Sequence, residues 1–268
     1  MIRILVTNVL ALFILLLGVQ SVSSELLVGQ TVNICDDQSE WPPFSYYERI
    51  NGKKTNRLTG FSVDVFQEIF GPHGFDVDIR LIPWKRCMHE VAQGERFYMF
   101  LSGSFNEDRA ASYYLSRPYY STRPYYFYSR EEHPDGLDIK NSKDLKNFRV
   151  CGISGYNYAD YGLDLDEIDA TATDYETLKL KIIRNRCDLF IENIEVMAGF
   201  SKIGIDFLAD EDLGHAAVPE MEPYQFHMMF TRNALGKKLQ SIVNEGLTEL
   251  ERSGKLRELI EFYAIPGN

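Results

Sequence analysis

The stretch FDVDIRLIPWKRCMHEVAQGERFYMFLSGS, residues 75–104, reads as a strand, a helix and a second strand. Its first nine residues alternate between apolar and polar side chains, as the two faces of a strand require. The middle segment opens with Pro83 and ends at Gly94, which are typical start and stop signals of a helix. The closing FYMFLSGS is the next strand. A unit of this kind favours parallel pairing of its strands.

The same alternation extends from this unit in both directions. On the N-terminal side, LVGQTVNICDD (27–37) is strand-like and GFSVDVFQEIFGPHG (60–74) carries a helical apolar stripe closed by Gly71-Pro72. On the C-terminal side the pattern restarts, with expected strands at 144–154, 187–193 and 224–231 and expected helices at 175–186 and 194–204. The last segment predicts two helices split at Ser253-Gly254.

Two such blocks predict an α/β fold with two lobes, each a mixed sheet flanked by helices. Connections near residues 125–131 and 222–228 are the expected hinge segments. The division is lobe 1 at 25–128 and 226–268, and lobe 2 at 129–225. Ligands of α/β sheets bind outside the carboxyl ends of the strands, so the cleft between the lobes is the expected site.

The N-terminus predicts export. A short positive segment, MIR, is followed by the apolar run 5–19 and by QSVSS, with Val22 and Ser24 at the positions that a signal peptidase reads. The alternative is a membrane anchor, but the apolar run is shorter than the ~20 residues of a span. We expect a signal peptide at 1–24, a mature chain from about Glu25 and a periplasmic location. No cysteine lies at the expected cleavage point to carry a lipid anchor.

Composition and charge narrow the class of partner. The chain is 45% hydrophobic and 25% charged, as in an ordinary globular protein, with a net charge of −11. Removal of 1–24 takes away Arg3 and no acidic residue, so −11 becomes −12. This balance argues against nucleic acid and anionic membranes as partners.

The four cysteines, Cys35, Cys87, Cys151 and Cys187, all lie in the expected mature chain. They form no CxxC and have no histidine at metal-like spacing, which argues against zinc. An even number in an exported protein favours two disulfides. Four cysteines allow three connectivities, and at this point all three stay open.

Several motifs occur in the order of a known family: WPPFSYY, GFSVDVFQEI, PWKRCMHEVAQG, FLSGSFNEDRAASYYLSRPYY, RVCGISGYN, DLFIEN and LTELERSGKLRELIEFY. Together they resemble the bacterial extracellular solute-binding proteins of the polar amino acid type, which serve ABC importers. The resemblance implies a type II periplasmic-binding-protein-like fold, whose two lobes close on a small ligand by hinge motion. It also implies a monomer without a cofactor, and a membrane permease or sensor receptor as partner.

The resemblance assigns ligand-binding roles in lobe 1. Trp41 and Trp84 match the family's two aromatic walls, although both rings are also suited to a buried core. Arg109 matches the arginine that binds the ligand's carboxylate, and a guanidinium forks onto a carboxylate through two parallel bonds. The alternative for Arg109 is a surface ion pair with a neighbouring acid, worth little. Ser102 and Gly103 match positions that approach the ligand.

The resemblance is less regular in lobe 2. Tyr156 and Asn157 stand where the family carries small hydroxyl residues that help to hold the carboxylate. Asn193 stands where the family carries an aspartate that pairs with the ligand's ammonium. Glu192 is adjacent, but successive strand residues point to opposite faces, so we expect Asn193 rather than Glu192 to face the cleft.

Within the family frame the cysteines pair inside each lobe. Cys151 and Cys187 fall in strands expected to be neighbours, which leaves Cys35 and Cys87 for a bridge in lobe 1. The alternative is that one pair stays as buried thiols. Bridges inside each lobe would leave hinge closure free.

Two other functions remain open at the level of sequence. Some proteins with this fold are dehydratases of cyclohexadienyl substrates, which need a buried acid with a raised pKa, and Glu192 is the candidate here. No catalytic motif supports that chemistry, so we expect a binding protein rather than an enzyme. A sensory module that presents its closed form to a receptor would use the same site chemistry.

Overall fold

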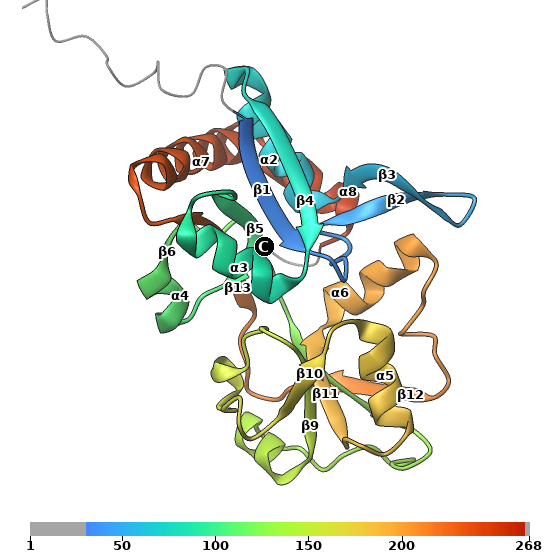
Figure 1. Cartoon of the computed structure of the whole chain (residues 1–268). Helices are drawn as coiled ribbons and strands as arrows, with labels where there is room; N and C mark the ends of the chain where they lie inside the picture. Colours follow the sequence, from blue (N-terminus) through green and yellow to red (C-terminus); the bar gives the residue numbers. More distant parts are fainter. Residues whose placement is uncertain (1–30, 266–268) are drawn as a thin grey trace, which may run out of the picture.

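The computed structural model describes residues 31–265, and the expected signal peptide at 1–24 lies outside them. Two lobes lie one above the other in Figure 1, each built on its own sheet. The mixed α/β, two-lobed fold that the sequence predicts is confirmed. Within residues 31–265, no helix combines the length and the apolar character that crossing a bilayer requires.

Lobe 1 contains a six-stranded mixed sheet in the order β4-β1-β5-β13-β6, with β7 also paired to β13. Its strands are β1 (Thr31–Asp37), β4 (Asp76–Ile82), β5 (Met99–Ser104), β6 (Tyr113–Leu115), β7 (Tyr120–Thr122) and β13 (Tyr224–Thr231). β1 pairs parallel to β4 and β5, whereas β13 pairs antiparallel to β5, β6 and β7. The 75–104 stretch is therefore a strand–helix–strand unit with β1 inserted between its two strands.

Helices cover both faces of this sheet (Figure 1). They are α2 (Phe61–Phe70), α3 (Trp84–Gln93), α4 (Glu107–Ser112), α7 (Ala234–Ser253) and α8 (Lys255–Tyr263), with the 3-10 turn η1 (Gly71–His73) after α2. β1 divides its side chains between the faces: Val32 and Ile34 join the core under α2 and α7, and Cys35 joins the cluster under α3. Gly254, with φ 81°, separates α7 from α8 as the sequence predicts.

A hairpin of β2 (Tyr46–Ile50) and β3 (Lys53–Thr59) extends from lobe 1 and was not expected from the sequence. Asn51 and Gly52 form its tip with φ 52° and 74°. Positive φ at both central residues is the requirement of the tight hairpin turn that Asn-Gly favours. Its strands are mostly polar and, apart from Tyr46, partly or fully exposed, so they lack the apolar alternation that marks a strand in sequence.

Lobe 2 contains a five-stranded mixed sheet in the order β10-β9-β11-β8-β12. Its strands are β8 (Pro124–Ser129), β9 (Val150–Ile153), β10 (Asp169–Ala172), β11 (Leu189–Asn193) and β12 (Leu213–Ala217). The helices are α5 (Tyr175–Ile183) and α6 (Ile194–Gly199), with 3-10 turns η2 (Ser142–Asn147), η3 (Ala159–Tyr161) and η4 (Phe200–Ile203). β9, β10 and β11 are parallel, and β8 runs against β11 and β12.

The chain crosses between the lobes at two places. β7 ends at Thr122 in the first sheet and β8 begins at Pro124 in the second, so the outward crossing is at Arg123. The return crossing spans residues 218–223, between β12 and β13. The strand pairing therefore assigns residues 124–128 to the second sheet and 224–225 to the first, a few residues from the boundaries drawn on the sequence.

Both expected disulfides are confirmed, each inside one lobe. Cys35–Cys87 joins β1 to α3, and Cys151–Cys187 joins β9 to the residue two positions before the start of β11. The alternative of a buried thiol pair is wrong, because none of the four cysteines is free. Each bridge has one cysteine in a strand, β1 or β9, whose carboxyl end faces the other lobe (Figure 1).

Candidate functional site

A pocket with a volume of about 60 Å³ lies between the two lobes. Seven of the eight residues predicted to bind ligand line it: Trp41, Trp84, Ser102, Arg109, Tyr156, Asn157 and Asn193. Lobe 1 contributes the carboxyl ends of the parallel strands β1 and β5, and lobe 2 contributes the end of β11. The pocket is thus where the strand-end rule for α/β sheets expects it.

Gly103 is the predicted residue that does not line the pocket. Along β5, Ser102 and Ser104 face the pocket, so the residue between them faces the opposite side. A Cβ placed on Gly103 would lie 2.8 Å from both Met229 and Phe100. A glycine at this position accommodates close packing behind the strand.

Arg109 is buried at the pocket wall, not paired on the surface. The side chain of Asn106 caps α4 by accepting a hydrogen bond from the backbone N–H of Arg109 at 2.7 Å. The Nη1 group of Arg109 donates to the carbonyl and the hydroxyl of Ser104, both at 2.9 Å, and Nη2 donates to the Gly155 carbonyl at 3.3 Å. These acceptors are all neutral.

Burial lowers the pKa of Arg109 to about 10. Among residues 31–265, no carboxylate lies within 4 Å of its guanidinium, so the surface pair with Glu107 or Asp108 is absent. Asp160 acts on the guanidinium electrostatically but forms no ion pair with it. A buried cation without a directly paired anion is costly unless a partner enters. The guanidinium is therefore suited to receive an anionic group.

The two tryptophans wall the pocket and also belong to the core. Trp84 packs edge-on against Phe100, with 5.0 Å between ring centroids, and its Nε1 donates to the Gly155 carbonyl at 3.0 Å. Trp41 packs on Phe226 at 4.8 Å. Its Nε1 has no protein acceptor within the part of the chain that the structure describes. Both rings are therefore buried with the core and also line the pocket.

Hydrogen bonds join the lobes across the pocket. The Tyr156 hydroxyl donates to Asp37 Oδ2 at 2.8 Å, and Asn157 Nδ2 donates to the Phe105 carbonyl at 3.0 Å. Asn106 Nδ2 donates in turn to Asn157 Oδ1 at 3.1 Å. Together with the Gly155 contacts, these bonds define a closed arrangement of the two lobes.

Glu192 and Asn193 both line the pocket, which corrects the expectation that only Asn193 would face it. The carboxylate turns back along the strand end: Glu192 Oε1 accepts hydrogen bonds from the backbone N–H and the side-chain amide of Asn193 at 2.7 and 2.9 Å. The Tyr175 hydroxyl donates to Glu192 Oε2 at 2.8 Å. The alternation rule fails because β11 ends at Asn193 and α6 begins at the next residue, Ile194.

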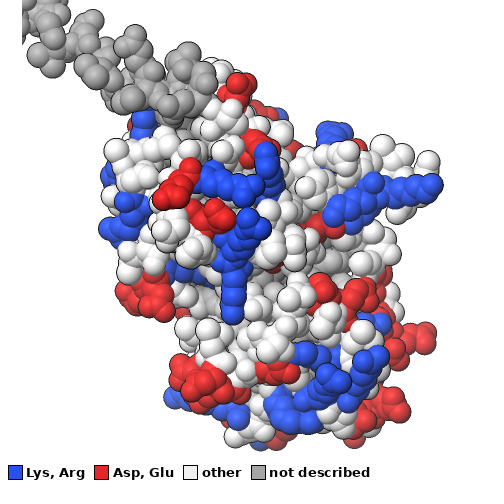
Figure 2. Space-filling view, in the orientation of Figure 1, with Lys and Arg blue, Asp and Glu red and all other residues white. Residues whose placement is uncertain are grey.

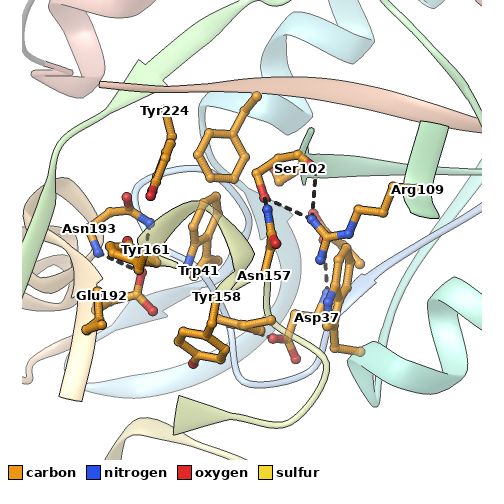
Figure 3. Close-up of a pocket in the computed structure, with 16 residues that line it drawn as sticks. Asp37, Trp41, Ser102, Arg109, Asn157, Tyr158, Tyr161, Glu192, Asn193 and Tyr224 are labelled. Atoms are coloured by element: carbon orange, nitrogen blue, oxygen red, sulfur yellow. Dashed lines mark hydrogen bonds between the residues drawn. The ribbon is translucent and has the colours of Figure 1, made fainter. Parts of the chain in front are cut away.

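Three buried carboxyl groups share the pocket: Asp36, Asp37 and Glu192. Burial raises the pKa of Asp36 and of Glu192 to about 7, and it also raises the pKa of Asp37. In Figure 3, Glu192 and Asn193 lie on the side of the pocket away from Arg109. The site therefore has a basic side and an acidic side.

Comparison with known proteins decides the family. The sequence profile of bacterial extracellular solute-binding proteins, family 3, matches residues 33–265. The chain belongs to this family.

Relatives of this family 3 protein are consistent with its two-lobed fold. It is 27% identical over 228 residues to the probable amino-acid-binding protein YxeM of Bacillus subtilis (strain 168), covering 82% of this chain and 79% of YxeM. The substrate-binding protein of an amino acid ABC transporter has the same fold at 18% identity and a TM-score of 0.69, over 87% of this chain and 99% of that one. A histidine kinase sensor domain matches with the same identity and score, over 87% and 96%.

Sequence reasoning missed part of this family 3 site. The missed lining residues are Asp36, Asp37, Ser104, Tyr158, Tyr161, Ile191, Tyr224 and Phe226. The two aspartates had a signal, because an acidic pair closes a predicted parallel strand, where ligands bind. Tyr224 and Phe226 alternate at the start of β13, which follows the return crossing. Tyr161 ends the 3-10 turn η3 and Tyr158 directly precedes it, and no sequence signal predicts this turn.

Proposed function

We propose that this family 3 solute-binding protein captures a small carboxylate-bearing ligand, an amino acid or a related compound, between its two lobes. The observation that carries the proposal is the buried Arg109 guanidinium, whose acceptors in the described chain are neutral oxygens. A ligand carboxylate would supply the missing charge through two parallel hydrogen bonds. Trp41 and Trp84 would hold the apolar part of the ligand.

The proposal includes the cellular context. The protein would be exported by cleavage of residues 1–24, act as a monomer in the periplasm without a cofactor, and deliver its ligand to an ABC permease. The relative YxeM and the ABC-transporter structure, both named for amino acid binding, support this reading. Figure 2 shows basic and acidic side chains interspersed over one face of the protein, in line with a small-molecule ligand rather than a polyanion.

A thermal-shift screen across amino acids, other small carboxylates and amines tests the proposal. A ligand that binds the folded protein raises its melting temperature by mass action. We expect a carboxylate hit on the wild type, and loss of that hit in Arg109→Ala. Arg117→Ala is the matched control, because Arg117 pairs with Glu251 on the surface and does not line the pocket. A hit that survives Arg109→Ala unchanged would contradict the proposal.

Sensing is a second candidate, favoured by the likeness to a histidine kinase sensor domain. The closed form would then be recognised by a membrane receptor instead of a permease. Copurification of the ligand-loaded protein with solubilised inner-membrane proteins separates the two, because it recovers either permease subunits or a receptor kinase.

An enzyme is the third candidate, and Glu192 is the observation that favours it. Its carboxyl group is buried in the pocket and its pKa is raised to about 7, as a general acid requires. Both of its oxygens already accept hydrogen bonds from protein groups, which favours a binding role. Incubation with prephenate or arogenate tests this candidate, and we expect no product.

A further inference from the structure

Gly155 lies in the turn that follows β9 of lobe 2, and it packs against the N-terminal half of α3 in lobe 1. Its φ of 88° is in the left-handed region, which favours glycine. A Cβ built at this position would lie 2.7 Å from Lys85 Cγ, 3.1 Å from Trp84 Cδ1 and 3.2 Å from Met88 Cε. All three atoms belong to lobe 1, so the two lobes approach this closely because residue 155 has no side chain.

The carbonyl of the same glycine accepts two hydrogen bonds from lobe 1. Trp84 Nε1 donates to it at 3.0 Å, and Arg109 Nη2 donates to it at 3.3 Å. A guanidinium has five N–H donors, and the bonds of Arg109 to Ser104 and Gly155 use three of them. Two donors remain for a ligand carboxylate, so one guanidinium can hold the ligand and lobe 2 at the same time.

Both sides of this contact are fixed within their own lobe. The Cys35–Cys87 bridge holds α3 on β1, and the Cys151–Cys187 bridge holds β9, which leads into the turn. Neither α3 nor the turn can therefore retreat easily inside its lobe. A side chain added at Gly155 is accommodated by moving the lobes apart.

The contact also separates two spaces in the cleft. A second cavity, of about 110 Å³, lies beside the ligand pocket, and Asp37 and Trp84 line both. In lobe 2, Tyr156 lines the ligand pocket and Ser154 lines the second cavity, so Gly155 is the residue between them. Its contact with Trp84 closes this side of the ligand pocket.

We propose that Gly155 is the closure contact of this protein: its lack of a side chain lets lobe 2 reach α3, and its carbonyl couples lobe 2 to the guanidinium that receives the ligand. This inference rests on the proposed function and deepens it, because it names what holds the closed form around a carboxylate. Gly155 is a positioning residue that acts through its backbone. Loss of the contact therefore weakens all ligands by a similar factor and leaves the selectivity among them unchanged.

Gly155→Ala breaks the contact, and Gly204→Ala is its matched control. Gly204 also lies in lobe 2 and also has a φ of 88°, but a Cβ built there has nothing within 4 Å. Both substitutions place alanine in the left-handed region and carry similar backbone strain. Only Gly155→Ala places a methyl group against lobe 1.

The contact itself is tested by ¹H–¹⁵N NMR of the indole N–H groups, with and without a mixture of the standard L-amino acids. The chain has two tryptophans and so gives two indole signals, which Trp84→Phe assigns. In at least one of the two conditions, we expect the wild-type Trp84 signal to be protected from solvent exchange. Gly155→Ala should lose that protection and Gly204→Ala should keep it. Trp41, whose Nε1 has no protein acceptor among residues 31–265, is the internal reference.

Two results of these spectra would overturn the proposal. One is a Trp84 signal that Gly155→Ala leaves unchanged in both conditions. The other is an equal loss of protection in Gly204→Ala, because backbone strain alone would then explain the effect.

Lys85 and Arg86 supply a second check on the steric argument. Both are exposed cations in the first turn of α3, but only the Lys85 side chain lies in the path of the added methyl group. Lys85→Ala, combined with Gly155→Ala, should recover part of the Trp84 protection. Arg86→Ala, which removes a surface pair with Glu90, should recover none. Equal recovery in the two double variants would overturn the steric part of the proposal.

Calorimetric titration with each standard L-amino acid measures the consequence for binding. We expect Gly155→Ala to weaken every amino acid that binds the wild type by about 10-fold, with the order of affinities unchanged, and Gly204→Ala to stay within about 2-fold of the wild type. A changed order would show that Gly155 selects among ligands and would overturn its role as a closure contact. Failure of every L-amino acid to bind the wild type would contradict the proposed function for amino acids, and the indole spectra would still decide whether the contact forms.

Discussion

The basic and the acidic sides of the pocket hold their charges in different ways. Arg109 donates to neutral oxygens of Ser104 and Gly155. Asp37 and Glu192 accept from hydroxyl and amide groups. No ion pair joins the two sides in the described chain. Because each side is satisfied only by neutral groups, each remains available for a counter-charge that a ligand brings.

The two lobes of the pocket are each tied to their scaffold by one disulfide. Cys35–Cys87 fixes β1, which carries Asp36 and Asp37, to α3, which carries Trp84, and Cys151–Cys187 fixes β9 beside β11, which carries Glu192. Each disulfide closes a loop within its own lobe, so each supports one half of the pocket and leaves closure free.

Removal of either disulfide should have the largest effect and should affect the two halves almost equally. The cysteines are separated by 52 and 36 residues, and loop entropy depends only on the logarithm of that number. Double replacement by alanine should therefore cost about 4 kcal/mol in either lobe. Calorimetric melting measures the loss of stability. A loss on removal of only one of the two disulfides would contradict the predicted equality.

The pH dependence of stability probes the acidic half. Burial raises the pKa of Asp36 and Glu192 from 3.8 and 4.5 to about 7, so the folded protein binds these protons more tightly than the unfolded chain. The resulting stabilisation is fully present below about pH 4 and is lost as the pH rises through 7. We expect the melting temperature of the ligand-free protein to fall by about 5 °C from pH 5.5 to pH 8.

Replacement of both acids by their amides, in Asp36→Asn with Glu192→Gln, should flatten this profile. A wild-type melting temperature that rises between pH 5.5 and pH 8 would show that other titrating groups dominate, and the acidic half would then not be protonated when empty.

The two tryptophans test how much one hydrogen bond between the lobes contributes to ligand binding. Trp84→Phe removes the indole N–H that donates to Gly155 across the pocket, whereas Trp41→Phe removes an N–H without a protein acceptor in the described chain. Both variants lose a similar volume. We expect Trp84→Phe to weaken ligand binding about 5-fold more than Trp41→Phe, from the loss of one hydrogen bond. Equal losses in calorimetric titration would contradict the closed arrangement.

The cap of α4 has the smallest expected effect. Asn106 accepts from the Arg109 N–H and donates to Asn157 in the other lobe. Asn106→Ala loses both bonds and should cost about 1 kcal/mol of stability. Asn106→Asp keeps the cap and loses the donor, so it should retain most stability and weaken binding about 2-fold to 3-fold. A larger loss of stability in Asn106→Asp than in Asn106→Ala would show that the interlobe bond matters more than the cap.

Most of the fold could be predicted from the sequence, because its elements carry local signals. Pro83 and Gly94 bound α3, and Gly254 separates α7 from α8, each at the expected position. The β2–β3 hairpin was missed because its strands are mostly polar and show no apolar alternation, although Asn51-Gly52 marks its turn. The outward crossing at Arg123 was misplaced by a few residues, since strand pairing is not local.

Site residues that could be recognised by their side-chain type were predicted, and those that depend on the three-dimensional arrangement were missed. Arg109 and the two tryptophans carry recognisable chemistry, and the structure brings them to one pocket. Glu192 was expected to face away, because alternation along a strand does not describe a strand end that runs into a helix. The hydrogen bond from Tyr156 to Asp37 joins residues 119 positions apart in two lobes, which no local pattern contains.

The most direct test of the two-sided pocket is a crystal structure of the protein with its best thermal-shift ligand. We predict that the ligand's carboxylate oxygens lie within hydrogen-bonding distance of the Arg109 guanidinium, between the rings of Trp41 and Trp84. A ligand bound elsewhere, or bound in this pocket with its carboxylate away from Arg109, would contradict the account.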